Sequence, residues 1–199
     1  AGDPGPAADD HSPEQMNRET MNETHTVFQE IKDFIGFGDG DVASLQAIAP
    51  IFAVHGAAIT DAFYVKLGAD PEQSKLIEGR VDALKRTHNR WMTELFAGDY
   101  GEAYFDGRWR IGLAHVRVGV KPWWVEAVTS YLRTEGLGLL TNEIADAGQR
   151  TRSVQALVKI LDIDLMIINL AYSAETIDRL TQFTGMSRKL IERCVSLKK

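Results

Sequence analysis

The feature that most constrains this chain is a nearly continuous series of helical apolar repeats from Met21 onward, with almost no alternation of apolar and polar residues. Apolar residues that recur about every three to four positions indicate amphipathic helices, and Gly and Pro between the repeats mark their ends. The repeats predict helices over residues 24–35, 41–67, 78–96, 100–118, 123–145 and 149–180, the second of them divided in two at Pro50. The sequence therefore predicts an all-α fold.

The last predicted helix is apolar over a wide part of its circumference. One stripe consists of Val154, Leu157, Leu161, Leu165, Ile168 and Tyr172, and it is widened by Ile160, Ile163, Ile167 and Ala171. Such a helix is usually buried from two sides. We expect a second subunit to cover one side, so that the last two long helices form a four-helix bundle in a homodimer, with Ile167 on the outer face.

The two ends of the chain differ in composition from its middle. Residues 1–20 are rich in Pro, Gly, Ala and Asp, which predicts a disordered leader. Residues 21–175 form the predicted folded domain, and residues 176–199 a helical extension interrupted at Gly185. Because so short an extension cannot form a catalytic domain, we expect the output to lie in a partner or in a longer protein.

Charge and cysteine content exclude several classes of function. The formal net charge is −6 and no dense Lys/Arg stripe occurs, so a nucleic-acid partner is not expected. Asp162 and Asp164 interrupt the apolar run from Leu161 to Tyr172, which argues against a membrane span. A single cysteine, Cys194, excludes an internal disulfide, and no signal-peptide pattern is visible, so we expect a cytoplasmic protein.

His115 stands out among the residues that could carry chemistry. Ile111, Gly112 and Val118 share its helical face, and a glycine inside a helix usually marks a close approach by something bulky. A neutral imidazole on an apolar face suits the proximal side of a haem iron. Periodicity alone favours the other interpretation, a buried histidine bonded to a carbonyl group.

Three segments resemble the globin-coupled sensor and protoglobin family. Residues 110–122, Arg-Ile-Gly-Leu-Ala-His-Val-Arg-Val-Gly-Val-Lys-Pro, resemble the family's proximal motif. Residues 61–67 resemble its distal Asp-Ala-Phe-Tyr segment, and residues 90–98 are similar to its Trp-containing stretch. The resemblance covers residues 27–172 and implies a three-over-three globin fold with an extra N-terminal helix.

The resemblance also implies roles for particular residues. His115 would bind the iron of haem b, Tyr64 would donate a hydrogen bond to O₂, Thr87 would assist Tyr64, and Leu84 would control water access. The pocket would further contain Phe63, Trp91, Ile111, Gly112, Val118 and Trp124. His88 is a candidate sixth ligand, the alternative being a histidine packed against the haem edge or a neighbouring helix. Tyr64 has the alternative role of a core tyrosine.

The implied function is the sensing of a diatomic gas, O₂, CO or NO, with the signal passed through the dimer helices. Two other functions remain open at this stage. One is a haem-free globin that serves as an interaction domain, and the other is haem-iron enzyme chemistry on NO, nitrite or peroxide. Many relatives carry Trp-Tyr where this chain has Trp124-Val125, so a signalling role for that tyrosine is not expected here.

Overall fold

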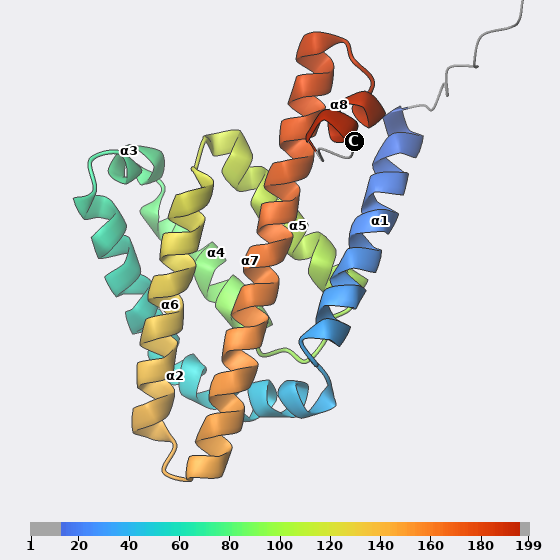
Figure 1. Cartoon of the computed structure of the whole chain (residues 1–199). Coiled ribbons are helices and arrows are strands. Elements are labelled where there is room, and N and C mark those ends of the chain that lie inside the picture. The colour runs from blue at the N-terminus through green and yellow to red at the C-terminus, as the bar shows by residue number, and fades with distance from the viewer. Residues whose placement is uncertain (1–12, 196–199) are drawn as a thin grey trace, which may run out of the picture.

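The computed structural model describes residues 13–195, with side chains described from residue 23. Over this range the chain forms helices and no strand, which confirms the predicted all-α class (Figure 1). The helices are α1 (Pro13–Phe34), α2 (Asp39–Ala69), α3 (Gln73–Ile77), α4 (Val81–Glu94), α5 (Glu102–Val118), α6 (Pro122–Glu143), α7 (Ala147–Thr184) and α8 (Arg188–Val195).

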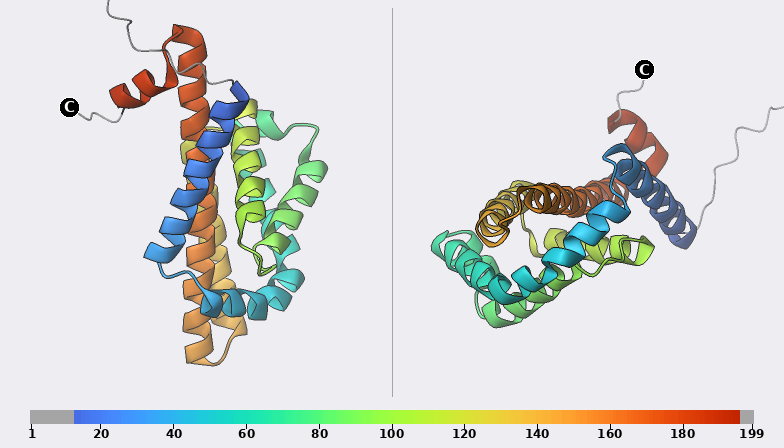
Figure 2. Two further views of the ribbon diagram at one scale, coloured as in Figure 1. Left: turned by 90° about the vertical axis from the view of Figure 1, so that its right-hand side faces the viewer. Right: turned by 90° about the horizontal axis from the view of Figure 1, so that it is seen from below.

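Helix α1 begins earlier than the apolar repeat indicated. Residues 13–20 of the predicted leader are helical, and residues 1–12 lie outside the described range. Pro13 suits the first position of a helix, and most of the residues that follow it favour helix, which apolar periodicity alone does not reveal. Figure 2 shows α1 lying across α7 and α5, where its Phe28 packs on Phe105 with ring centroids 5.3 Å apart.

Helix α2 is continuous where two helices were predicted. Pro50 lies inside the helix and does not begin a new one. A proline within a helix removes one backbone hydrogen bond and bends the axis, and the α2 ribbon changes direction partway along (Figure 1). The second half of α2 contacts α4, where the Thr60 hydroxyl oxygen lies 2.9 Å from His88 Nδ1.

By length and composition α2 is also apolar enough to cross a membrane, which the sequence analysis did not anticipate. A single helix of this kind is weak evidence for a span, because helices of a protein core can be equally long and apolar. Five apolar residues of α2 are buried in this fold: Leu45, Ile48, Phe52, Phe63 and Tyr64.

Helix α7 is the central helix, and other helices of the same chain cover most of its apolar surface. It packs on α5, α6 and α2, with α1 also in contact. Ile167 has no exposed surface, and Ile160, Ile163 and Ala171 are similarly buried. The expectation that Ile167 lies on an outer face is therefore wrong. Helix α5 covers α7 on one side, and α2 and α6 cover it on the other.

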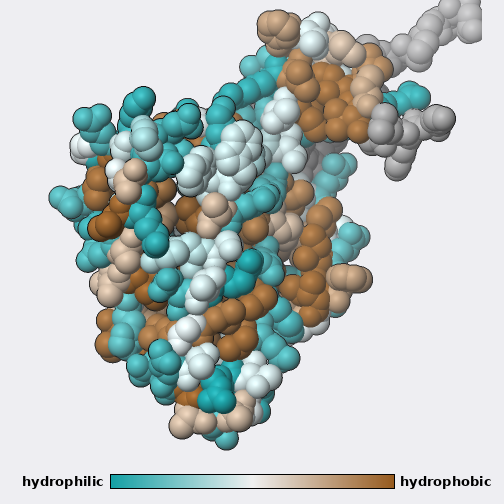
Figure 3. All heavy atoms as spheres, turned by 60° about the vertical axis from the view of Figure 1, so that its left-hand side comes forward, coloured by the Kyte–Doolittle hydropathy of each residue, from teal (hydrophilic) through white to brown (hydrophobic). Residues whose placement is uncertain are grey.

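The chain reverses at the end of α7, close to where an interruption was predicted. Gly185 adopts a φ of +69°, a left-handed conformation that glycine adopts readily, and ends the helix. Helix α8 then packs against α7 through the buried Ile191. Exposed apolar side chains gather around this turn, at Leu180, Phe183, Met186 and Leu190 (Figure 3).

Candidate functional site

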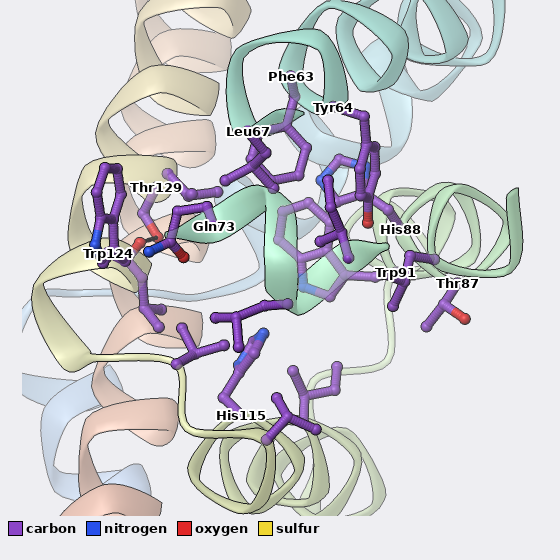
Figure 4. A pocket seen from close by; sticks show the side chains of 18 of the residues that line it. Phe63, Tyr64, Leu67, Gln73, Thr87, His88, Trp91, His115, Trp124 and Thr129 are labelled. Carbon is purple, nitrogen blue, oxygen red and sulfur yellow. Dashed lines mark hydrogen bonds between the residues drawn. The ribbon is translucent and has the colours of Figure 1, made fainter. Parts of the chain in front are cut away.

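A largely apolar cavity of about 250 Å³ lies between the end of α2, α3, α4, α5 and α6 (Figure 4). Nine of the predicted pocket residues line it, and so does the candidate sixth ligand His88. They are Phe63, Tyr64, Leu84, Thr87, Trp91, Ile111, His115, Val118 and Trp124. Segments far apart in the sequence thus meet at one site, as the predicted roles require.

His115 projects into this cavity from the last turns of α5. Its Nδ1 atom is buried and has no hydrogen-bond partner among the described residues, so the alternative of a histidine bonded to a carbonyl is not met at this atom. Burial lowers the pKa of the imidazole, which keeps it neutral. A neutral imidazole that is not tied to the protein can offer a ring nitrogen to a metal.

Tyr64 reaches the cavity from α2, on the other side from His115 (Figure 4). The residue is buried, and its hydroxyl points into the cavity in this view. Desolvation raises the pKa of the phenol to about 12. The hydroxyl therefore keeps its proton at any physiological pH and remains a hydrogen-bond donor.

His88 lies beside Tyr64, on the α4 side of the cavity. Its ring packs on Phe63 and Trp91, with centroid separations of 5.2 Å and 5.1 Å. Its Nδ1 lies 2.9 Å from the Thr60 hydroxyl oxygen, whereas its Nε2 is buried without a partner among the described residues. Burial lowers the pKa of His88 to about 4, so this imidazole is neutral as well.

Two predicted pocket residues are placed differently from expectation. Gly112 is not part of the cavity lining: a Cβ atom there would lie 2.7 Å from the Ala171 Cβ and 3.1 Å from the Ile168 carbonyl oxygen. The bulky neighbour that this glycine accommodates is α7. Thr87 does line the cavity, but it is exposed and its hydroxyl donates to the Ala83 carbonyl at 3.1 Å. Figure 4 shows the Thr87 hydroxyl directed away from the cavity.

Apart from Trp124, sequence reasoning missed the lining that comes from α3, the turn after it and α6. These residues are Gln73, Leu76, Ile77, Arg80, Val125, Val128, Thr129 and Leu132. In α6 the apolar residues Val125, Val128 and Leu132 recur at helical spacing, but periodicity does not say whether such a face meets a helix or a cavity. Helix α3 is too short to give a periodic signal.

A buried cluster of charged residues lies next to the cavity wall at Trp91. Sequence reasoning did not identify this cluster. Asp164 of α7 is 3% exposed and Arg108 of α5 is 1% exposed, and Arg108 Nε lies 2.9 Å from Asp164 Oδ2. Asp164 also accepts hydrogen bonds from the Tyr104 hydroxyl and, at 2.7 Å, from Trp91 Nε1. Because Trp91 lines the cavity, the cluster joins the cavity wall to α5 and α7.

The electrostatics of the cluster balance two opposed effects. Burial raises the pKa of the Asp164 carboxyl, and the Arg108 guanidinium and the hydrogen bonds from Tyr104 and Trp91 oppose that rise. Arg108 makes a second ion pair, with Glu94 of α4, at 2.6 Å. In the sequence, Asp164 is visible only as a charge that interrupts an apolar run. Its spacing gave no signal that it faces Arg108.

These residues fit haem better than they fit a bare metal ion. Within the described residues, no three His, Cys, Asp or Glu side chains converge to hold an ion. The site instead offers an apolar lining and a neutral imidazole without a partner on Nδ1, which suits a flat apolar macrocycle with one axial nitrogen ligand. Tyr64 and His88 face the same cavity from the other side.

Comparison with known proteins shows the family and the fold of this chain. A model of the Protoglobin family matches residues 24–178. The globin domain of a Geobacter sulfurreducens globin-coupled sensor is 33% identical, with a TM-score of 0.70, over 72% of this chain and 96% of that domain. The globin domain of Escherichia coli DosC, solved in a ferric form, is 16% identical with a TM-score of 0.63, over 72% of this chain and 98% of that domain. A ferrous form of the same domain gives a TM-score of 0.62.

Proposed function

This chain belongs to the protoglobin family, and on that premise we propose that it is a haem-based sensor of a diatomic gas, with His115 as the axial ligand of haem b. The observation that carries the proposal is the neutral His115 imidazole, which projects into an apolar cavity with no partner on Nδ1. Haem would supply an iron that binds O₂, CO or NO.

The protein would stabilise the gas through Tyr64. The phenol keeps its proton and faces the cavity opposite His115, so it can donate a hydrogen bond to a ligand that carries partial negative charge. O₂ gains more from such a donor than CO does, because bound CO is less polar. Thr87 is a weaker candidate for this role, since its hydroxyl is already bonded to Ala83.

A Tyr64→Phe substitution tests this role. Loss of the donor should raise the O₂ dissociation rate of the haem-loaded protein about tenfold or more, because a hydrogen bond to a charged group contributes about 1.5–3 kcal/mol. The CO dissociation rate should change much less. Tyr131→Phe, which removes a hydroxyl outside the cavity lining, is the matched control. Equal changes for O₂ and CO in flash-photolysis and stopped-flow measurements would show that Tyr64 acts only by packing.

The signal would pass from the His115 helix to α7. Helix α5 carries His115, and three residues earlier its Gly112 packs directly on the backbone of α7. A displacement of α5 on gas binding would therefore be transmitted to α7. We propose that α7 relays the change to an output module or partner protein.

We further propose that the protein is a homodimer and that its interface involves the outer face of α7. Leu165, Met166 and Leu170 are partly exposed there, at helical spacing, around a shallow hollow. A Met166→Glu substitution should lower the dimer fraction in sedimentation experiments, and an unchanged dimer would place the interface elsewhere. Ile167, the residue suggested by the sequence pattern, is unsuitable for this test because it lies in the core.

A further inference from the structure

Thr60 holds a position that neither the sequence motifs nor the proposed gas chemistry explains. It lies in α2, one turn before Tyr64, and is 1% exposed. Its hydroxyl oxygen lies 2.9 Å from His88 Nδ1 and 2.8 Å from the Oδ1 atom of Asn89. The hydroxyl thus joins a histidine of the cavity wall to the neighbouring amide.

Counting the protons in these two contacts assigns the tautomer of His88. The Thr60 hydroxyl has a single proton, and it donates this proton to Asn89 Oδ1, an oxygen that can only accept. The contact between Thr60 and His88 therefore needs its proton from the histidine, which places the N–H on Nδ1. A neutral imidazole has one N–H, so Nε2 carries a lone pair.

The position of the ring is constrained as well. The His88 ring stacks on Phe63 at an interplanar angle of 29°, and the Trp91 ring packs on it at 36°. Tyr64 meets it edge-on, with centroids 6.2 Å apart. The buried Nε2 has no partner among the described residues, and a buried polar atom left unsatisfied in this way calls for a ligand that the protein itself does not provide.

We propose that Thr60 and Asn89 are positioning residues that preset His88 to bind the haem iron through Nε2. This inference rests on the proposed haem function. His88 then occupies the site opposite His115 in the resting protein, and a gas must displace it. Through the Thr60–Asn89 pair, α2 and α4 together set how readily that displacement occurs.

The first experiment needs no haem. Long-range ¹H–¹⁵N correlation NMR of the haem-free protein distinguishes the two tautomers of a neutral imidazole, and a His88→Gln spectrum identifies the signals of His88. We expect the proton on Nδ1. A proton on Nε2 would overturn the inference, because it would mean that the Asn89 amide donates to Thr60 and that His88 cannot bind a metal through Nε2.

Asn89→Ala provides a sharper test because Asn89 is exposed and its loss leaves the core intact. Without its acceptor, the Thr60 hydroxyl becomes free to donate to His88 Nδ1. We expect the proton of His88 to move toward Nε2 in the haem-free variant. An unchanged tautomer would show that Asn89 has no control over His88.

The second experiment compares Thr60→Val with Thr60→Ser in the haem-loaded protein. The valine keeps the shape of the side chain without the hydroxyl, whereas the serine keeps the hydroxyl. Visible and EPR spectra of the wild-type and Thr60→Ser proteins should be low-spin and six-coordinate. Thr60→Val should shift toward high-spin, with a CO association rate about tenfold higher or more, because a larger share of the protein is open to the gas. Unchanged spectra and rates in Thr60→Val would overturn the inference.

Failure of the proposed function gives a different result. If the protein takes up no haem, the visible spectra show no haem bands. The tautomer measured in the haem-free protein still decides whether Thr60 and Asn89 control His88.

Discussion

Burial without a charged partner sets the chemistry of the cavity residues. Desolvation lowers the pKa of both His88 and His115 and raises that of Tyr64, so all three side chains are neutral near pH 7. A metal ligand needs an unprotonated ring nitrogen, and a hydrogen-bond donor needs its proton. The same apolar lining therefore prepares histidine and tyrosine for opposite roles.

Neutral His88 makes the haem-free protein sensitive to acid. The pKa of His88 is about 4 in the folded protein, against an ordinary value of 6.5, so between these values the unfolded chain binds a proton that the folded chain does not. The stabilisation that comes from neutral His88 is fully present above pH 6.5 and decreases as the pH falls toward 4. At pH 5 the loss from His88 should be about 2 kcal/mol.

Urea unfolding of the haem-free protein at pH 7 and pH 5 measures this effect, with His88→Gln as the control that cannot titrate. The wild type should lose more stability than the variant by roughly the amount above. If the two proteins lose the same amount, His88 is not buried as a neutral imidazole.

Close approach between α5 and α7 is the main structural constraint at the scale of helices. Gly112 was expected to make room for a cofactor, and it makes room for α7. The sequence did indicate that something bulky approaches this position, because a helical glycine seldom occurs without such a cause. It could not indicate which group approaches, because periodicity places a residue on a face of its own helix and does not name the neighbour.

Gly112→Ala should therefore destabilise the fold. The added methyl group would meet the Ala171 side chain and the backbone of α7, and such overpacking costs about 1–3 kcal/mol. Gly107→Ala is the matched control in the same helix, because a Cβ there meets nothing within 4 Å. It should stabilise the protein by about 0.5–1 kcal/mol through helix propensity. Thermal or urea unfolding that shows the same sign of change for both variants would contradict the packing described here.

The buried Asp164–Arg108 ion pair is a second contact that holds α5 and α7 together. Asp164→Asn would leave the Arg108 guanidinium buried opposite a neutral amide, and breaking such a pair costs about 3–5 kcal/mol. Asp162→Asn, which alters an exposed pair with Arg133, should cost about 0–1 kcal/mol. Equal losses in the two variants would mean that the buried cluster contributes no more than a surface ion pair.

At the scale of the whole molecule, the helices, the cavity and most of its predicted lining follow from helical periodicity and from the motifs around Tyr64, Trp91 and His115. Three features do not. The continuity of α2 through Pro50 depends on tertiary packing that tolerates a bent helix. The second feature is that helices of the same chain cover most of α7. A wide apolar stripe looks the same in a sequence whether its neighbour is internal or a second subunit. The Thr60–His88 contact joins residues of α2 and α4, which no local pattern relates.

The most direct test of the haem function is a titration of the haem-free protein with haemin, monitored at the Soret band. His88→Gln removes the second imidazole of the cavity and should still bind haemin with one-to-one saturation. Adding His115→Gly to this variant should weaken haemin binding about tenfold or more, because the axial nitrogen is lost, and free imidazole should restore the spectrum. A double variant that binds haemin as tightly as His88→Gln, with the same spectrum and no response to imidazole, would contradict the assignment of His115 as the axial ligand.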